Sequence, residues 1–187
     1  VSLTPGLAPV EIETYYSAQS LSVIFENIVN APYKIAIFIS TGVFDSALGL
    51  RLVGAIIGII AVIIFYLLVR NLFGNMVSLA STAMFASSSL LLGMSRTANP
   101  NIMLLSLLAI VAAGAFLRFG KKPSLGWVIA ALVGGLSLYV PGMLVFILLA
   151  VIWQFKHIKQ TLEQAKAPFI IAASIIFGVL CAPIIVS

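Results

Sequence analysis

Charged residues are scarce in this chain of 187 residues. Asp, Glu, Lys and Arg make up 8% of it, 62% is hydrophobic, and the mean hydropathy is +1.22. Soluble domains carry about 25% charged residues, so this composition excludes a soluble globular domain. The apolar runs are continuous and lack the apolar–polar alternation of a membrane β-barrel. The composition therefore predicts an all-α fold, a polytopic transmembrane helix bundle.

Residues suited to metal, redox or nucleotide chemistry are rarer still. The chain has five acidic and ten basic residues, and the basic ones lie between apolar runs without interleaved aromatics, so no nucleic-acid partner is predicted. Cys181 is the only cysteine and cannot form an intrachain disulfide, and His157 stands alone in a polar loop. No metal-ligand spacing, Walker loop, G-x-S-x-G or Ser/His/Asp set is present. The sequence therefore predicts no cofactor and no metal site.

The chain also lacks a starting Met and a signal peptide. It opens in polar loop sequence and stops in an apolar run. We expect it to be a piece of a longer protein that has lost at least one upstream span.

The apolar runs predict six membrane spans. Their ranges are 47–69, 76–95, 101–117, 125–140, 142–155 and 168–186. The fourth and fifth are short for a bilayer that needs about 20 residues per helix, and Pro141-Gly142 separates them. They form either a hairpin or one long kinked helix.

Loop charge distinguishes these two alternatives. With a hairpin, the basic residues of the 118–122 and 156–166 segments fall on the same side as Arg70. The positive-inside rule favours this arrangement and places residues 1–46 outside the cytoplasm. The predicted location is a bacterial plasma membrane, with an extracytoplasmic loop at 1–46 and a helical bundle at 47–187.

The loop at 1–46 has helical features of its own. Pro9 suits the first turn of a helix, and Glu11 and Glu13 would lie near its positive end. Farther on, the i, i+3, i+4, i+7 spacing of Leu21, Ile24, Phe25 and Ile28 predicts an amphipathic helix at 20–29. We expect these four side chains to face membrane or other helices.

The predicted spans lack ionisable residues away from their ends, which counts against an ion-driven pump. Polar groups gather instead at the outer interface. The candidates are Glu11, Glu13, Tyr15, Tyr16, Lys34, Asp45, Arg51, Arg96, Asn99 and Asn101. A site there can meet a lipid headgroup on one side and a water-soluble partner on the other.

Each candidate also has a purely structural explanation. Glu11 and Glu13 can favour a helix N-terminus, Asp45 can cap the next helix, and Arg51 can reach lipid headgroups, as can Arg96. Lys34 can serve as an anchor, and the tyrosines can form an interfacial belt. Glu11 and Glu13 are two apart, so on a helix they point about 200° from each other, and only one faces a shared site.

Several segments together resemble a known family. An acid-bearing outer loop precedes "APYKIAIF"; then come "ALGLRLVGAIIGIIAVIIFYLLVRNLFG" at 47–74, "VSLASTAMFASSSLLLGMSRTANPN" at 77–101 and "GGLSLYVPGML" at 134–144. Their order and spacing resemble the GT-C superfamily of glycosyltransferases. The nearest type is that of protein mannosyltransferases and lipid A aminoarabinose transferases, glycosyltransferase family 39.

The resemblance implies roles for particular residues. An acid of the first outer loop acts as general base or orients the acceptor, which falls on Glu13 or Glu11. The Glu-x-x-Tyr spacing from Glu13 to Tyr16 is closer to the family pattern. The sequence departs from that pattern at Asn99 and Asn101, where a second acid is common; asparagine can bind a sugar hydroxyl but cannot take a proton. The resemblance leaves a divalent metal ion as the alternative to the absence of a cofactor, and the missing acid counts against it.

The implied reaction moves a sugar from a polyprenyl-phosphate donor, lodged among membrane lipids, to an acceptor hydroxyl at the outer face. Arg51, Arg96 or Lys34 would stabilise the leaving phosphate. A non-catalytic membrane scaffold or assembly subunit of the same fold is the alternative, supported by the missing acid at 99–101. We predict that Glu13 faces a cavity with Arg96 and Arg51 around it, and that Glu11 serves the helix end.

Overall fold

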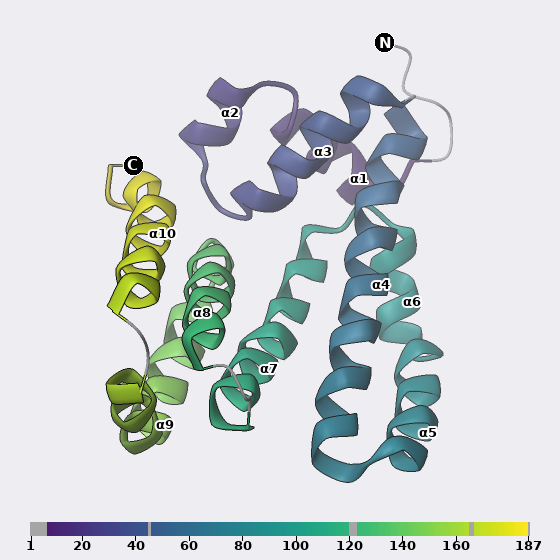
Figure 1. Ribbon diagram of the computed structural model, residues 1–187. Helices are drawn as coiled ribbons and strands as arrows, with labels where there is room; N and C mark the ends of the chain where they lie inside the picture. Colours follow the sequence, from purple (N-terminus) through teal and green to yellow (C-terminus); the bar gives the residue numbers. More distant parts are fainter. Residues whose placement is uncertain (1–6, 45, 120–122, 165–166, 187) are drawn as a thin grey trace. The chain divides into compact units, whose positions relative to one another are not determined.

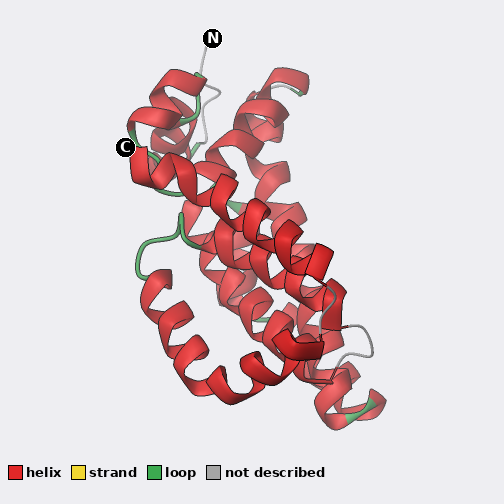
Figure 2. Ribbon diagram, turned by 60° about the vertical axis from the view of Figure 1, so that its left-hand side comes forward, coloured by secondary structure: helices red, strands yellow, loops and turns green. Residues whose placement is uncertain are grey.

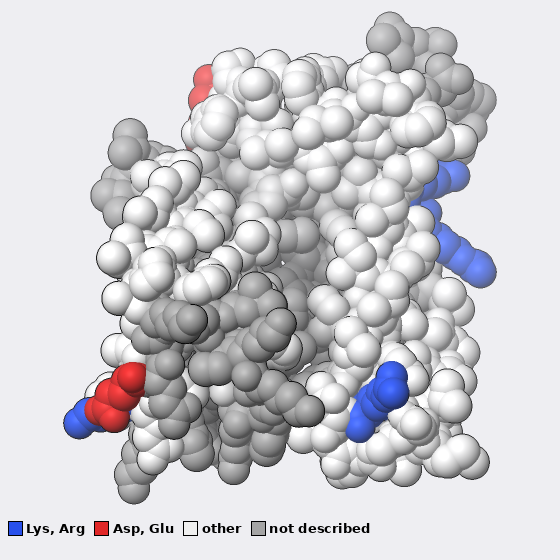
Figure 3. All heavy atoms as spheres, in the orientation of Figure 1, with Lys and Arg blue, Asp and Glu red and all other residues white. Residues whose placement is uncertain are grey.

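The structure is a computed structural model that describes residues 7–44, 46–119, 123–164 and 167–186. Every regular element in these ranges is a helix, which confirms the predicted all-α fold (Figures 1 and 2). The chain divides into two compact units, Val1–Met103 and Leu104–Ser187. Figure 3 shows one face of the molecule, on which few side chains are charged.

The first unit begins with three short helices before the long one. In chain order its helices are α1 (Pro9–Ser17), α2 (Leu21–Glu26), α3 (Ala31–Val43), α4 (Ser46–Phe73), α5 (Asn75–Ala86) and α6 (Ser89–Arg96). Local chemistry sets these bounds. Pro9 opens α1, and the Ser20 and Ser88 hydroxyls accept the backbone N–H of Val23 and Leu91 at the starts of α2 and α6. The short 3₁₀ helix η1 (Pro100–Leu105) follows α6.

Helix α4 is the centre of the first unit and contacts α3, α5 and α6. Its buried stripe, Leu50, Val53, Ala61 and Leu68, follows the spacing of one helix face. Close approach to α3 depends on Gly49, whose carbonyl accepts the Ser40 hydroxyl at 2.9 Å. A Cβ on Gly49 would lie 2.9 Å from the Ser40 carbonyl oxygen, so only glycine fits there.

The second unit contains α7 (Ser106–Phe119), α8 (Pro123–Ser137), α9 (Met143–Gln164) and α10 (Ala167–Val186). Helix α8 contacts the other three. Two glycines permit this packing, because a Cβ on Gly126 would lie 2.8 Å from the Leu117 side chain and one on Gly135 would lie 2.7 Å from that of Leu180. The Tyr139 hydroxyl, which follows α8, donates to the Leu180 carbonyl at 2.7 Å and ties the turn to α10.

The six predicted spans coincide with helices, but their lengths differ. Within the described ranges, three helices are long and apolar enough to cross a membrane: Ala47–Phe73, Pro100–Leu117 and Ala167–Ile184. The second predicted span is a pair, α5 and α6, bent by 56° at Ser87–Ser88. The fourth and fifth are separate helices joined by the turn at 138–142, and their apolar parts, Gly126–Ser137 and Met143–Ile152, are short. The number of crossings remains a prediction.

The amphipathic segment of the first loop differs from its prediction. The expected helix at 20–29 ends at Glu26, and only Ile24 of the four apolar side chains is fully buried. Leu21 and Phe25 are exposed in the structure, so they do not pack against other helices of the described chain. That they face a membrane surface remains a prediction. The apolar stretch after it forms a helix, α3, that the sequence reasoning did not identify.

Candidate functional site

Helix α1 presents two different faces. Glu11, Thr14 and Ala18 are buried, at the i, i+3, i+7 spacing of one helix face. Val10, Glu13 and Tyr16 are exposed on the other side. The two glutamates therefore point to different sides of α1, as their spacing predicts, with Glu11 buried and Glu13 exposed. Glu11 serves the helix end, as predicted, because it accepts the backbone N–H of Ala8. The cavity predicted in front of Glu13 remains a prediction.

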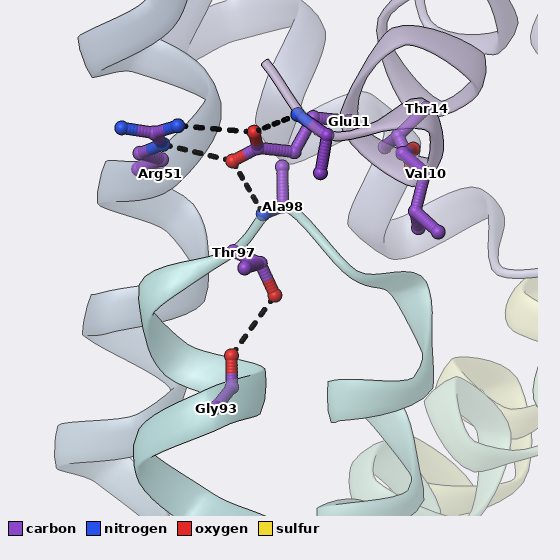
Figure 4. Close-up of polar contacts among 8 residues, drawn as sticks. Val10, Glu11, Thr14, Arg51, Gly93, Thr97 and Ala98 are labelled. Carbon is purple, nitrogen blue, oxygen red and sulfur yellow. Dashed lines mark hydrogen bonds and ion pairs between the residues drawn. The ribbon is translucent and has the colours of Figure 1, made fainter. Parts of the chain in front are cut away.

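The Glu11 carboxylate joins three elements (Figure 4). Its Oε1 accepts Nε of Arg51 at 2.8 Å and the backbone N–H of Ala98 at 3.3 Å. Its Oε2 accepts Nη2 of Arg51 at 3.0 Å and the backbone N–H of Ala8 at 2.8 Å. A carboxylate has about four acceptor positions, so these contacts fill them.

The local sequence explains why Glu11 can take this place. It is the third residue of α1, from which a glutamate reaches back to the N–H of the capping residue, Ala8. The Arg51 hydrogen bonds hold the pKa of Glu11 below its ordinary value, and the two backbone N–H groups act in the same direction against burial. Glu11 is fully buried, whereas the Arg51 side chain is 47% exposed, so one end of the ion pair meets solvent.

Two glycines of α4 bring the end of α6 to this carboxylate. A Cβ on Gly54 would lie 3.2 Å from the carbonyl oxygens of Ser95 and Thr97, and one on Gly58 would lie 2.8 Å from Cβ of Ser95. The close packing of α4 against α6 therefore depends on the small residues at 54 and 58. Because α4 and α6 pack this closely, the N–H of Ala98 lies within hydrogen-bond distance of the Glu11 carboxylate. A backbone donor of this kind leaves no residue-type signal, and the sequence reasoning missed it.

Lys34 lies apart from the ion pair. Its Nζ donates to the Asn27 carbonyl at 2.7 Å, just after α2, and the side chain is largely buried. Burial lowers the pKa of Lys34. The structure thus gives Lys34 an anchoring contact between α2 and α3, and its predicted role at a phosphate remains a prediction.

The other predicted substrate-binding residues lie at the surface of the first unit. Arg96 is exposed at the last turn of α6, and Asn101 is exposed in η1, where its N–H donates to Oδ1 of Asn99 at 2.9 Å. The Tyr16 ring packs edge-on against that of Tyr15. Among the described residues, no hydrogen bond or ion pair links Arg96, Asn101 or Tyr16 to either glutamate.

Tyr33 was missed as a candidate. It is 1% exposed, and its hydroxyl has no hydrogen-bond partner in the described part of the chain. Burial, and the negative charge of Glu11, raise the pKa of Tyr33 above its ordinary value. The tyrosine is therefore a neutral donor beside a saturated carboxylate.

The described ranges offer no ligand set for a metal ion, since no three His, Cys, Asp or Glu side chains come together within them. The chemistry available at α1 is that of one enclosed carboxylate paired with the Arg51 guanidinium and one accessible carboxylate.

Comparison with known proteins identifies a protein family that matches most of the chain. The family model described as dolichyl-phosphate-mannose-protein mannosyltransferase matches residues 30–186. No curated protein matches significantly, and no solved structure does. The matched region contains Lys34, Arg51, Arg96 and Asn101 and begins after α1. The family implies a membrane glycosyltransferase of the GT-C type, in agreement with the apolar helices, and over this length the match shows that the chain belongs to it.

Proposed function

We propose that this protein transfers a sugar from a polyprenyl-phosphate donor to an acceptor hydroxyl at the extracytoplasmic face of a bacterial plasma membrane. The family description names a dolichyl-phosphate sugar as donor, which is a lipid of this chemical class. A donor with a long apolar tail suits a protein whose described surface is largely apolar.

The contrast between the two glutamates of α1 carries the assignment of roles. Glu11 has no acceptor position left, so it can take a proton only by giving up a hydrogen bond from Arg51 or the backbone. Glu13 is exposed, and no hydrogen bond or ion pair of its carboxylate occurs among the described residues. We therefore assign Glu13 as the general base, with Glu11 as the residue that holds α1 in place.

The proposed step balances as a single displacement. Glu13 takes the proton of the acceptor hydroxyl, and the oxygen forms a bond to the anomeric carbon. The bond from that carbon to the phosphate oxygen breaks, and polyprenyl phosphate leaves. Arg96 is exposed and stabilises the leaving phosphate in this proposal, while Arg51 is already engaged with Glu11. Tyr16 and Asn101 are the proposed contacts to substrate hydroxyls.

The test is transfer by the full-length protein, reconstituted in liposomes with a polyprenyl-phosphate sugar and a hydroxyl acceptor. A base contributes typically 10²–10⁴-fold to rate, so Glu13→Gln should lose transfer by about that factor. Glu13→Asp should keep part of it. Glu26→Gln is the matched control, since Glu26 is an exposed acid of the same loop outside the proposed site, and it should leave transfer unchanged.

The competing function is a non-catalytic membrane scaffold, favoured by Asn99 and Asn101 where the resemblance expects an acid. Transfer from the lipid donor by the wild-type protein, lost in Glu13→Gln, would exclude the scaffold. Equal transfer by wild type and Glu13→Gln would refute the assigned base, and no transfer by the wild type with any polyprenyl-phosphate sugar would favour the scaffold.

A further inference from the structure

Helices α7, α8, α9 and α10 surround a cavity of about 390 Å³ within the second unit. Small residues from all four helices create the space: Ala113, Ala130, Ala150 and Ala173 line it. Of the described lining residues, only Trp127 and Ser174 carry a polar side-chain atom. An apolar cavity of this size suits an apolar group.

One lining residue carries a polar atom that lacks its partner. Nε1 of Trp127 is buried and has no hydrogen-bond acceptor among the residues that the structure describes. A buried indole N–H usually finds an acceptor, and leaving one unpaired costs about 1–3 kcal/mol. The cavity therefore suits a ligand with an apolar body and an oxygen acceptor near Trp127.

A charged residue close to the cavity lining indicates which chemical group of a ligand could accept the Trp127 N–H. Trp127 lies near the start of α8. Lys159 is exposed on α9 beside Ile158, which lines the cavity. Basic residues next to a pocket between membrane helices favour anionic lipid headgroups.

We infer that this cavity holds one acyl chain of an anionic glycerophospholipid, with an ester or phosphate oxygen of that lipid accepting the indole N–H of Trp127. This inference does not depend on the proposed transfer reaction. All lining residues belong to the second unit, whereas the glutamates of α1 belong to the first.

Tryptophan fluorescence tests the inference directly. In a Trp153→Phe background, Trp127 is the only tryptophan of the chain. The purified chain in detergent is titrated with phosphatidylglycerol brominated on one acyl chain and, separately, with the same brominated chain on phosphatidylcholine. We expect saturable quenching by both, with the anionic lipid tighter by about fivefold for each participating cation.

Cavity-filling variants supply the control. Ala150→Leu should weaken the saturable quenching at least about tenfold, since the added atoms occupy the space of the chain. Ala172→Leu, on α10 but outside the lining, should leave it unchanged. If Ala150→Leu does not fold, Ala130→Leu tests the same space from α8. Native mass spectrometry of Trp127→Phe should show less retained phosphatidylglycerol than Trp153→Phe.

Three outcomes would overturn the inference. Quenching that never saturates would mean bulk lipid contact only. Equal affinity for phosphatidylglycerol and phosphatidylcholine would show that the cavity does not select an anionic headgroup. Displacement of the brominated lipid by polyprenyl phosphate, but not by unbrominated phosphatidylglycerol, would assign the cavity to the isoprenoid chain of a donor.

Discussion

At the residue scale, Glu11 and Glu13 show what a sequence pattern can decide. Helical geometry alone predicted that residues two apart point to nearly opposite sides. Which of them is buried depends on Arg51, 40 positions away, and on the Ala98 N–H, 87 positions away. Motif spacing to Tyr16 favoured Glu13 as the residue that faces a cavity, and that assignment remains a prediction.

The Glu11 ion pair predicts acid-sensitive stability. The pKa of Glu11 is lower in the folded protein than its ordinary value of 4.5, so the folded state binds fewer protons there. Its contribution is therefore present above about pH 4.5 and is lost as the pH falls through the folded-state pKa. Thermal unfolding of the purified protein in detergent between pH 3 and pH 7 measures this. Glu11→Gln should flatten the acid side of the profile, and an unchanged slope in that variant would contradict the role of Glu11.

At the element scale, hydrophobic runs located the helices well, and tertiary contacts set their lengths and ends. The runs identified α4, α7 and α10 because these are long and continuous. The break at Ser87–Ser88 was missed, because the hydroxyl of Ser88 starts α6 within a sequence that reads as one apolar span. The four-residue spacing of Gly54 and Gly58 is typical of helix-packing positions, since close approach of two helix backbones requires small residues.

The contact of α4 with α6 predicts that replacing two different glycines by alanine changes the stability of the protein in opposite directions. Gly58→Ala should lower the free energy of unfolding by about 1–3 kcal/mol, because its Cβ would lie 2.8 Å from Cβ of Ser95. Gly93→Ala, within α6, meets nothing within 4 Å and should leave stability unchanged or raise it by about 0.4–1 kcal/mol. Chemical denaturation in mixed micelles compares the two. Equal midpoints for the two variants would show that the α4–α6 contact is looser than described.

At the scale of the whole molecule, composition determined the class of protein, and the family match gave it a broad function. The topology is inferred from loop charge alone, that is, from the basic residues of the 118–122 and 156–166 segments. It therefore remains a prediction. Helices α8 and α9 are separate helices joined by the turn at 138–142, and the apolar parts of the two, Gly126–Ser137 and Met143–Ile152, are short.

Cysteine accessibility tests that topology. In a Cys181→Ser background, Pro141→Cys should react with an impermeant thiol reagent from outside intact cells. Ser124→Cys and Gln160→Cys should react only after the membrane is opened. Pro141 and Gln160 are exposed, so the reagent can reach both positions. Labelling of Gln160→Cys from outside would contradict the hairpin.

The division of labour between the two glutamates of α1 is the central claim, and one paired measurement tests it most directly. Transfer rate and thermal midpoint are measured side by side for Glu11→Gln and Glu13→Gln in the full-length protein. We predict that Glu13→Gln keeps the wild-type midpoint and loses transfer by about 10²–10⁴-fold. Glu11→Gln should lose about 1–3 kcal/mol of stability, a fall of several degrees in midpoint. Normal transfer by Glu13→Gln, or a wild-type midpoint for Glu11→Gln, would contradict the account.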